Sequence, residues 1–168
     1  MNNNNQKGVG LVEVLVALIL LAIAVLGFAA LQLKAVDASA EAGQQVLALT
    51  IARDLAELMR ANPQGLSDGK YKIGAVAVPS NDGTEAYGTE AGNPEKIAAQ
   101  DLQNAALQAS ENGMNLAVSR CPTSDARQCI YVAWGETSLV EGSDLKLENC
   151  IKDGAYVQGS HCLFLEAY

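Results

Sequence analysis

Apolar residues are spread unevenly along the chain, and the most extreme pattern lies near its beginning. Val14 to Leu31 is a run of 18 residues without a charged or polar side chain, VLVALILLAIAVLGFAAL. At a rise of about 1.5 Å per residue, a helix of this length spans roughly 27 Å, close to the thickness of a bilayer's hydrocarbon core. A helix on the surface of a soluble domain keeps one polar face, and this run has none. The pattern therefore predicts a membrane-spanning helix.

Beyond this run the apolar residues take the spacing of an amphipathic helix. Steps of three and four residues, with charged and amide side chains on the other faces, connect Val36, Ala40, Gly43, Leu47, Ile51, Leu55 and Leu58. We expect one continuous helix that begins at about Val9 and ends near Asn62, because Pro63 disfavours helical geometry in the residue before it. Residues 9–33 then form the membrane segment, and residues 34–62 form the amphipathic half.

The remaining residues, 63–168, predict a head that contains a second helix. Asn93, Pro94 and Glu95 combine a helix cap, a proline suited to the first turn and an acidic first turn. This helix should run to about Ser110. One buried face is expected at Ile97, Ala98, Leu102, Ala105, Ala106 and Leu107.

The rest of the head predicts connections and strands. Gln64–Gly69 is rich in turn residues and Pro79–Gly92 has almost no large apolar residue, so both are expected to be connections. One long helix, one short helix and about four strands indicate an α+β fold, with a small antiparallel sheet packed on the long helix. The expected strands are Tyr71–Val78, Asn115–Arg120, Ile130–Trp134 and Leu163–Leu165.

Composition and charge narrow the range of functions. The chain has 168 residues, with 11 Lys and Arg against 19 Asp and Glu, and a net charge of −8. Such a surface is poorly suited to neutralise phosphates, so we expect no direct nucleic-acid binding. The single histidine, His161, excludes histidine-rich metal sites and makes a Ser–His–Asp triad a poor fit. We expect no metal, no cofactor and no enzymatic activity.

The four cysteines all lie in the last 50 residues. An even number of cysteines beyond the membrane segment fits an oxidising compartment, and none forms a CxxC pair typical of zinc or redox sites. Four cysteines allow three pairings. We favour the pairing that closes two short loops around Gly-, Ser- or Asp-containing stretches, which joins Cys121 to Cys129 and Cys150 to Cys162.

The residues before the apolar run are unusual for a simple anchor. Residues 1–8, MNNNNQKG, are polar, carry one positive charge at Lys7 and end in Gly8. Glu13 then places a carboxylate inside the apolar stretch, where a lone charge costs at least a few kcal/mol. If the chain is cleaved after Gly8, Glu13 lies one helical turn from the new amino group of Val9. An amine–carboxylate pair, within one chain or between neighbouring subunits, would offset that cost.

A second processing scheme remains open. The segment Ala38–Ala40 has the small residues of a signal peptidase site, which would release a secreted domain beginning at Glu41. The apolar run is longer than the core of an ordinary signal peptide, and two charged residues lie between the run and the site. Cleavage after Gly8 accounts for Glu13, whereas signal-peptidase cleavage does not. Residues 1–8 are therefore interpreted as a leader peptide.

The segment Lys7–Leu18, KGVGLVEVLVAL, resembles the N-terminal signal of type IV prepilins. In that family a basic residue and a glycine precede the cleaved bond, and a glutamate is the fifth mature residue. The resemblance implies cleavage between Gly8 and Val9 by a prepilin peptidase, and N-methylation of Val9. The sequence departs from the commonest version of the signal, which has Phe and Thr where this chain has Val9 and Gly10.

Two later segments extend the resemblance. Arg53–Pro63 is similar to the end of the long helix in the type IV pilus modification protein, the PilV family of minor pilins, and Tyr131–Glu136 is similar to that family's central strand. The resemblance implies the type IV pilin fold. It also implies a subunit that takes part in initiating pilus assembly, sits at or near the pilus tip, and supports twitching motility, adhesion or DNA uptake.

The same resemblance implies partners and a location. The partners would be the prepilin peptidase, the other minor pilins and the major pilin, the assembly platform of the inner membrane, and a tip adhesin. The chain would cross the bacterial inner membrane once with its head in the periplasm, and later lie in the extracellular pilus. Two alternatives are a pseudopilin of type II secretion, which shares the N-terminal signal, and a secreted domain freed by signal peptidase.

Overall fold

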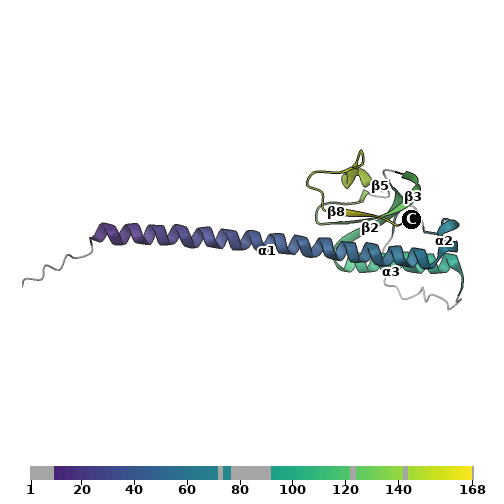
Figure 1. Ribbon diagram of the computed structural model, residues 1–168, viewed down its shortest axis with the longest axis horizontal. Helices are drawn as coiled ribbons and strands as arrows, with labels where there is room; N and C mark the ends of the chain where they lie inside the picture. Colours follow the sequence, from purple (N-terminus) through teal and green to yellow (C-terminus); the bar gives the residue numbers. More distant parts are fainter. Residues whose placement is uncertain (1–9, 72–73, 77–91, 122–123, 142–143, 168) are drawn as a thin grey trace, which may run out of the picture. The chain divides into compact units, whose positions relative to one another are not determined.

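The computed structural model describes residues 10–71, 74–76, 92–121, 124–141 and 144–167. The chain divides into two compact units, Met1–Ala42 and Gly43–Tyr168, and each is described by itself. The fold is α+β, as predicted, with a long N-terminal apolar helix, shorter helices and a small antiparallel sheet (Figure 1).

Helix α1 (Leu11–Ala61) is one helix of 51 residues, which confirms the predicted continuous helix and its end before Asn62. In the first unit its residues are exposed as far as Ala40. In the second unit one side of the helix is buried, through Ala48, Ile51, Ala52, Leu55, Ala56 and Met59. The compact unit thus includes the last part of α1.

The predicted apolar stripe of α1 is wrong at both ends. Val36 is 65% exposed and Leu58 is 41% exposed, although both fit the expected spacing. The buried face instead includes three alanines at steps of four residues, Ala48, Ala52 and Ala56. Small side chains let a packed neighbour approach closely. The face of α1 that is buried is therefore the face that packs on the sheet, and it is not simply the face with the largest apolar side chains.

Helix α2 (Pro63–Ser67) occupies most of the segment Gln64–Gly69, which was predicted as a turn. Proline ends α1, but its fixed φ and missing N–H suit the first position of a new helix. The side chain of Asn62 caps this helix by accepting a hydrogen bond from the Gly65 N–H at 3.1 Å. The residues that stop one helix therefore also start the next.

Helix α3 (Pro94–Glu111) confirms the predicted second helix and its cap. The side-chain oxygen of Asn93 accepts hydrogen bonds from the backbone N–H groups of Glu95 and Lys96. The predicted face is wrong at Ile97, which is 38% exposed, and at Leu107, which is half-buried. The residues that are buried are Ala98, Asp101, Leu102, Ala105, Ala106 and Ala109.

The main sheet has four antiparallel strands in the order β1-β2-β3-β8. They are β1 (Gly74–Ala75), β2 (Met114–Cys121), β3 (Ser124–Trp134) and β8 (Cys162–Glu166). Val132, near the end of β3, pairs with Leu116 on one side and Leu163 on the other. Three of the predicted strands are confirmed. The fourth, Tyr71–Val78, forms a strand at β1, and several of its residues lie outside the described part, as does nearly all of the predicted loop Pro79–Gly92.

Two short hairpins, not predicted from the sequence, follow β3. They are formed by β4 (Val140–Glu141) with β5 (Asp144–Leu145), and by β6 (Ile151–Lys152) with β7 (Ala155–Tyr156). A 3₁₀ helix, η1 (Leu147–Asn149), connects them.

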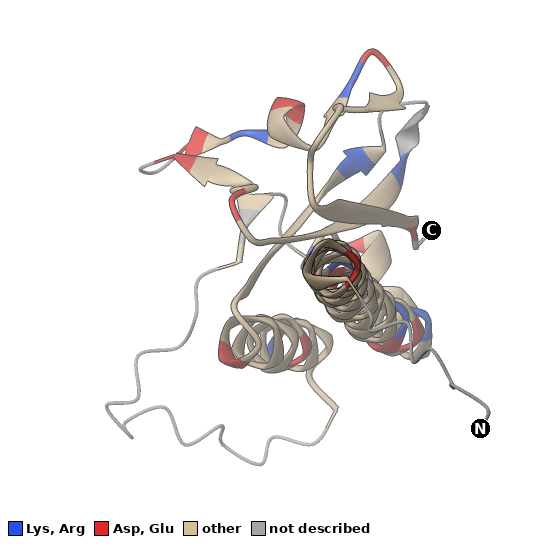
Figure 2. Cartoon of the chain, turned by 90° about the vertical axis from the view of Figure 1, so that its left-hand side faces the viewer, with Lys and Arg blue, Asp and Glu red and all other residues tan. Residues whose placement is uncertain are grey.

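The main sheet is covered on both faces. Because successive side chains of a strand point to opposite sides, β2 and β3 contribute to two cores. On one side Leu116, Val118, Ile130 and Val132 pack with α1 and α3. On the other side Tyr131 and the cysteines pack with residues of the hairpin region, including Leu139 and Ile151. Figure 2 shows both helices on one side of the sheet and the hairpins on the other.

A buried polar cluster joins the ends of the helices. The Tyr71 hydroxyl, which is fully buried, donates to the Asp101 carboxylate at 2.6 Å. The Asn62 amide donates to the Pro94 carbonyl oxygen at 2.8 Å. Gly65 allows this approach, because a Cβ there would lie 2.8 Å from the same carbonyl oxygen. The cluster fixes the ends of α1 and α2 against α3.

The cluster also makes stability depend on pH. Burial, assisted by the hydrogen bond to Asp101, raises the pKa of Tyr71 well above its ordinary value of about 10. Burial raises the pKa of the Asp101 carboxyl, and the hydrogen bond from Tyr71 opposes this shift. A raised pKa means that the unfolded chain loses its proton first. The free energy of unfolding should therefore fall as the pH rises from about 4 through the raised pKa of Asp101, and again above pH 10.

We predict that Tyr71→Phe lowers the free energy of unfolding by about 1–3 kcal/mol at neutral pH, because the buried Asp101 loses its donor. The variant should also lose part of the stability decline above pH 10; the remainder comes from Tyr131, whose pKa burial also raises. Denaturant unfolding of the purified chain in detergent, followed by circular dichroism from pH 7 to 11, measures both effects. Tyr156→Phe, at an exposed tyrosine, is the matched control, and equal curves for the two variants would contradict the prediction.

Candidate functional site

The first candidate surface is the apolar part of α1. Over its most apolar window of 18 residues the mean hydropathy is 3.1, and none of that window is buried. Its large apolar side chains are largely exposed, among them Leu11 at 77% and Leu31 at 72%. The helix is long and apolar enough to cross a membrane. An exposed apolar surface of this extent requires lipid or other helices to cover it.

Glu13 lies in the first turn of this helix. Its backbone N–H donates to the Gly10 carbonyl oxygen at 2.9 Å, so the turn is formed at that point. A carboxylate in a first turn interacts favourably with the positive end of the helix dipole. Gly8 and Val9, the predicted cleavage and methylation residues, lie outside the described residues. The pairing predicted between Glu13 and an amino group therefore stays a prediction.

The second candidate surface is the face of the head that carries the disulfides. Cys121 at the end of β2 is joined to Cys129 in β3, with the two Cα atoms 5.0 Å apart. The strand register shifts between Arg120 and Cys121. The Tyr131 hydroxyl donates to the Arg120 carbonyl oxygen at 3.0 Å. The disulfide and this hydrogen bond hold the distal end of the β2–β3 pair.

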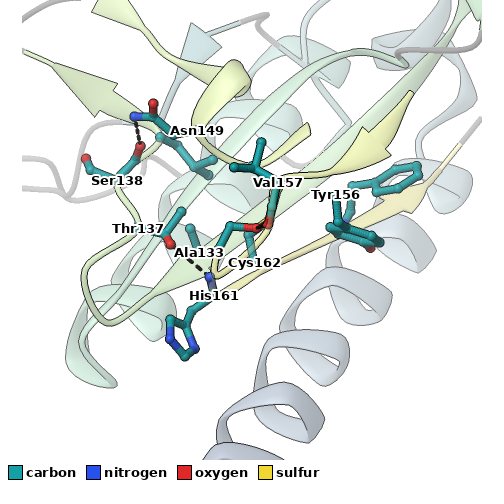
Figure 3. The surroundings of a disulfide bond; sticks show 12 residues. Ala133, Thr137, Ser138, Asn149, Tyr156, Val157, His161 and Cys162 are labelled. Carbon is teal, nitrogen blue, oxygen red and sulfur yellow. Dashed lines mark hydrogen bonds between the residues drawn. A yellow bond between two sulfur atoms is a disulfide. The ribbon is translucent and has the colours of Figure 1, made fainter. Parts of the chain in front are cut away.

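The second disulfide joins Cys150, which follows η1, to Cys162 at the start of β8 (Figure 3). This is the pairing that the sequence analysis favoured. Hydrogen bonds fasten the same region: the His161 N–H donates to the Thr137 hydroxyl at 2.8 Å, and the Asn149 amide donates to the Ser138 carbonyl oxygen at 2.9 Å (Figure 3). The β6–β7 hairpin is thereby connected to the sheet at its base.

Three aromatic rings extend from the sheet onto the hairpin. Tyr131 stacks on Phe164 with ring centroids 6.2 Å apart, and Phe164 contacts Tyr156 at 5.5 Å. The Phe164 N–H donates to the Tyr156 hydroxyl at 3.3 Å. Tyr156 is 53% exposed. The turn at Asp153 and Gly154, both with positive φ, lets this hairpin close tightly.

The described residues offer little for catalysis or metal binding. Within them no group of three or more His, Cys, Asp or Glu side chains could hold a metal ion. Cys162 is bonded to Cys150, so its sulfur cannot act as a nucleophile. The ring of His161 lies edge-on to Trp134, with centroids 6.3 Å apart. The disulfide and the ring contact both hold elements of the head together.

Sequence reasoning missed the polar residues that organise the head. Asp101 lies among apolar positions of α3, and a charged residue on an apolar face is the signal that would have shown the cluster with Tyr71. Asn115 accepts a hydrogen bond from the Leu139 N–H at 2.8 Å and donates to the Thr137 carbonyl oxygen at 3.3 Å. It fixes the connection after β3, and no local pattern indicated this role.

Two protein-family models match the chain. One, described as type IV pilin Tt1218, matches residues 30–101. The other, described as the prokaryotic N-terminal methylation motif, matches residues 3–29. The two matches adjoin, and together they cover α1 and the first part of α3. No curated protein and no solved structure matches the chain significantly.

We predict that the two disulfides stabilise different parts of the head. Cys150→Ser with Cys162→Ser should lower the free energy of unfolding by about 2–4 kcal/mol and loosen the β6–β7 hairpin, which forms only a two-stranded sheet of its own. Hydrogen exchange read by mass spectrometry should then show lost protection over residues 147–157. Cys121→Ser with Cys129→Ser is the control, because the β2–β3 ladder remains. Equal loss over 147–157 in both variants would be evidence against this division.

Proposed function

We propose that this chain is a type IV pilin, as the two family matches support, and that it is a minor pilin that takes part in initiating pilus assembly and sits at or near the pilus tip. The observation that carries the proposal is the apolar part of α1, whose large side chains are largely exposed and which overlaps the methylation-motif match. A helix of this kind needs a membrane before assembly and neighbouring helices afterwards. The minor role is supported by the likeness of Arg53–Pro63 and Tyr131–Glu136 to the PilV family of minor pilins.

The proposed processing follows from the leader. Prepilin peptidase cleaves between Gly8 and Val9, removes residues 1–8 and methylates the Val9 amine. The methylation-motif match over residues 3–29 supports this site, and it favours retention of the apolar helix over signal-peptidase cleavage before Glu41. Residues 9–33 remain as the membrane and filament segment.

The proposed location is the inner membrane, crossed once, with the head in the periplasm, and later the extracellular pilus. Two disulfides in the head support an oxidising compartment on that side. Lys7 on the short leading side supports a cytoplasmic N-terminus. The proposed partners are the other minor pilins, the major pilin, the assembly platform and a tip adhesin.

The pilin family is structural, and we assign the chain a structural role with no catalytic step. Contribution to twitching motility, adhesion or DNA uptake would follow from its place in the pilus. The test is a deletion strain that expresses an epitope-tagged copy. We expect few surface pili in the deletion strain, restored numbers with the tagged copy, and the tag in pili sheared from cells. Normal piliation with impaired type II secretion would instead identify a pseudopilin.

We predict that Gly8→Arg leaves an uncleaved precursor in the membrane. A bulky charged side chain next to the bond blocks the peptidase, and the retained leader would bring Lys7 into an apolar filament core. Mass spectrometry of the mature N-terminus separates precursor from product. Asn5→Arg adds the same charge away from the bond and should be processed normally. Recovery of fully processed Gly8→Arg protein would refute the proposed cleavage site.

We predict that Glu13→Ala keeps the chain in the membrane and leaves cleavage largely intact, but lowers its amount in sheared pili by about fivefold or more. The reason is the loss of a carboxylate that pairs with an α-amino group in the apolar core, where a lone charge is costly. Asp37→Ala removes a carboxylate from the same helix beyond the apolar run and serves as control. Wild-type levels of the Glu13 variant in pili would mean that Glu13 only reaches the headgroups of the membrane.

A further inference from the structure

An open groove of about 380 Å³ lies between α1 and α3 in the head, where both helices cover one side of the main sheet (Figure 2). Its described lining residues lie between Ile51 and Leu58 on α1 and between Asn104 and Glu111 on α3. Each of these stretches is about two helical turns, or about 12 Å, long. An elongated groove between two helices suits a third helix laid along it.

The floor of the groove is apolar. Ile51, Leu55 and Ala105 are buried there. Leu58 and Leu107 also line the groove and remain partly exposed, Leu58 at 41%. The spacing of Leu58 from Leu55 and Ile51 places all three on one side of α1. The buried apolar stripe of α1 therefore continues into the groove, where Leu58 leaves apolar surface for a partner to cover.

The rim of the groove is acidic. Asp54 of α1 and Glu111 of α3 are the charged side chains among its described lining residues. Within the described part of the chain neither carboxylate forms an ion pair, whereas Glu57, Glu95 and Glu166 each do. Two unpaired carboxylates beside an apolar floor favour a partner that brings a positive charge together with its apolar side chains.

Glu111 is placed where its charge costs stability. It is the last residue of α3, and the last turn of this helix has no basic residue. The C-terminal end of a helix carries a partial negative charge, which repels a carboxylate and favours Lys or Arg. A positively charged partner gives this carboxylate a role that the stability of the head does not.

A second copy of this chain does not supply the positive charge on a helix. Each basic residue of α1 has a carboxylate three or four residues away: Asp37 for Lys34, and Glu57 for Arg53 and Arg60. Helix α3 has more acidic than basic residues. The net charge of −8 also makes two copies repel each other. The groove therefore fits a helix of a different protein.

We propose that the α1–α3 groove binds a basic amphipathic helix of a different pilin subunit. A large apolar side chain of that helix packs against Leu58, and a Lys or Arg one turn away from it pairs with the carboxylates of Asp54 and Glu111. The inference rests on the proposed function, because the partner is another subunit of the same assembly. It adds to that function the surface and the chemistry that select the neighbour.

Photo-crosslinking in cells tests the contact with the full-length chain. A photoreactive amino acid replaces Leu58, and mass spectrometry maps the cross-linked peptide. We expect a link to a different pilin, in a peptide that carries a Lys or Arg three or four residues from the linked position. The same probe at Ile97, which is 38% exposed and does not line the groove, is the matched control and should give little of this product.

Charge variants test the recognition itself. Asp54→Lys should lower the yield of the Leu58 product by about five- to tenfold, because it places like charges together. Replacing the mapped basic residue of the partner by Glu should have the same effect, and the combination of both changes should recover part of the yield. Glu57→Lys makes the same change on α1 outside the groove and should leave the yield unchanged.

Glu111→Lys separates recognition from folding. A Lys at the end of α3 interacts favourably with the helix dipole, so the head should resist denaturant at least as well as the wild type. The yield of the Leu58 product should still fall by about fivefold or more. Misfolding cannot explain a loss of product in a variant of undiminished stability. Correct disulfides and protease resistance provide the same check for Asp54→Lys.

The outcomes separate this inference from the proposed function. A Leu58 link to a second copy, to a protein other than a pilin, or to a peptide without Lys or Arg overturns the inference even if the chain is present in sheared pili. The same holds if no product forms, or if Asp54→Lys and Glu111→Lys leave the yield unchanged. A mapped link to a basic segment of another pilin, made by a chain that is absent from pili, would instead support the groove contact and contradict the role as a pilus subunit.

Discussion

One helix has to satisfy two different surroundings, and the rest of the molecule follows from that constraint. In its first part α1 presents apolar side chains that nothing in the described chain covers. From Ala48 onward the same helix buries one side in a core shared with α3 and the sheet. Removing a leucine or isoleucine side chain from water stabilises by about 1.5–3 kcal/mol. The first part therefore gains this stabilisation only from lipid or from other helices, whereas the head gains it within the chain.

The head, by contrast, has buried cores of its own. Its sheet is covered by helices on one face and by the hairpin region on the other, which gives a small domain two cores. The Tyr71–Asp101 hydrogen bond and the two disulfides add further links between its elements.

The sequence alone was sufficient where a local signal decides the structure. Pro63 marked the end of α1, Asn93 with Pro94 marked the start of α3, and short loops favoured the disulfide pairing that the structure contains. Prediction from the sequence failed where contacts between residues far apart in the chain determine which side chains are buried. Leu58 fits the predicted stripe but is exposed, because the sheet selects the face that also carries the alanines. The buried Asp101 depends on a tyrosine 30 residues away. The exposed apolar helix was predictable because an uninterrupted apolar run indicates it without any knowledge of tertiary contacts.

The charges on α1 have a role that its apolar residues cannot fulfil. Between Leu11 and Val36 the charged residues are Glu13 and Lys34, one near each end of the apolar part. Apolar helix faces slide past one another at little cost, because lipid and leucine are equally apolar and no strong hydrophobic force selects one register. A charge in such surroundings tolerates few positions, so it selects the arrangement in which it is paired. In the proposed assembly the apolar residues hold the helices in the same environment. Glu13, paired with an amino group, then determines how far each subunit is displaced from its neighbour.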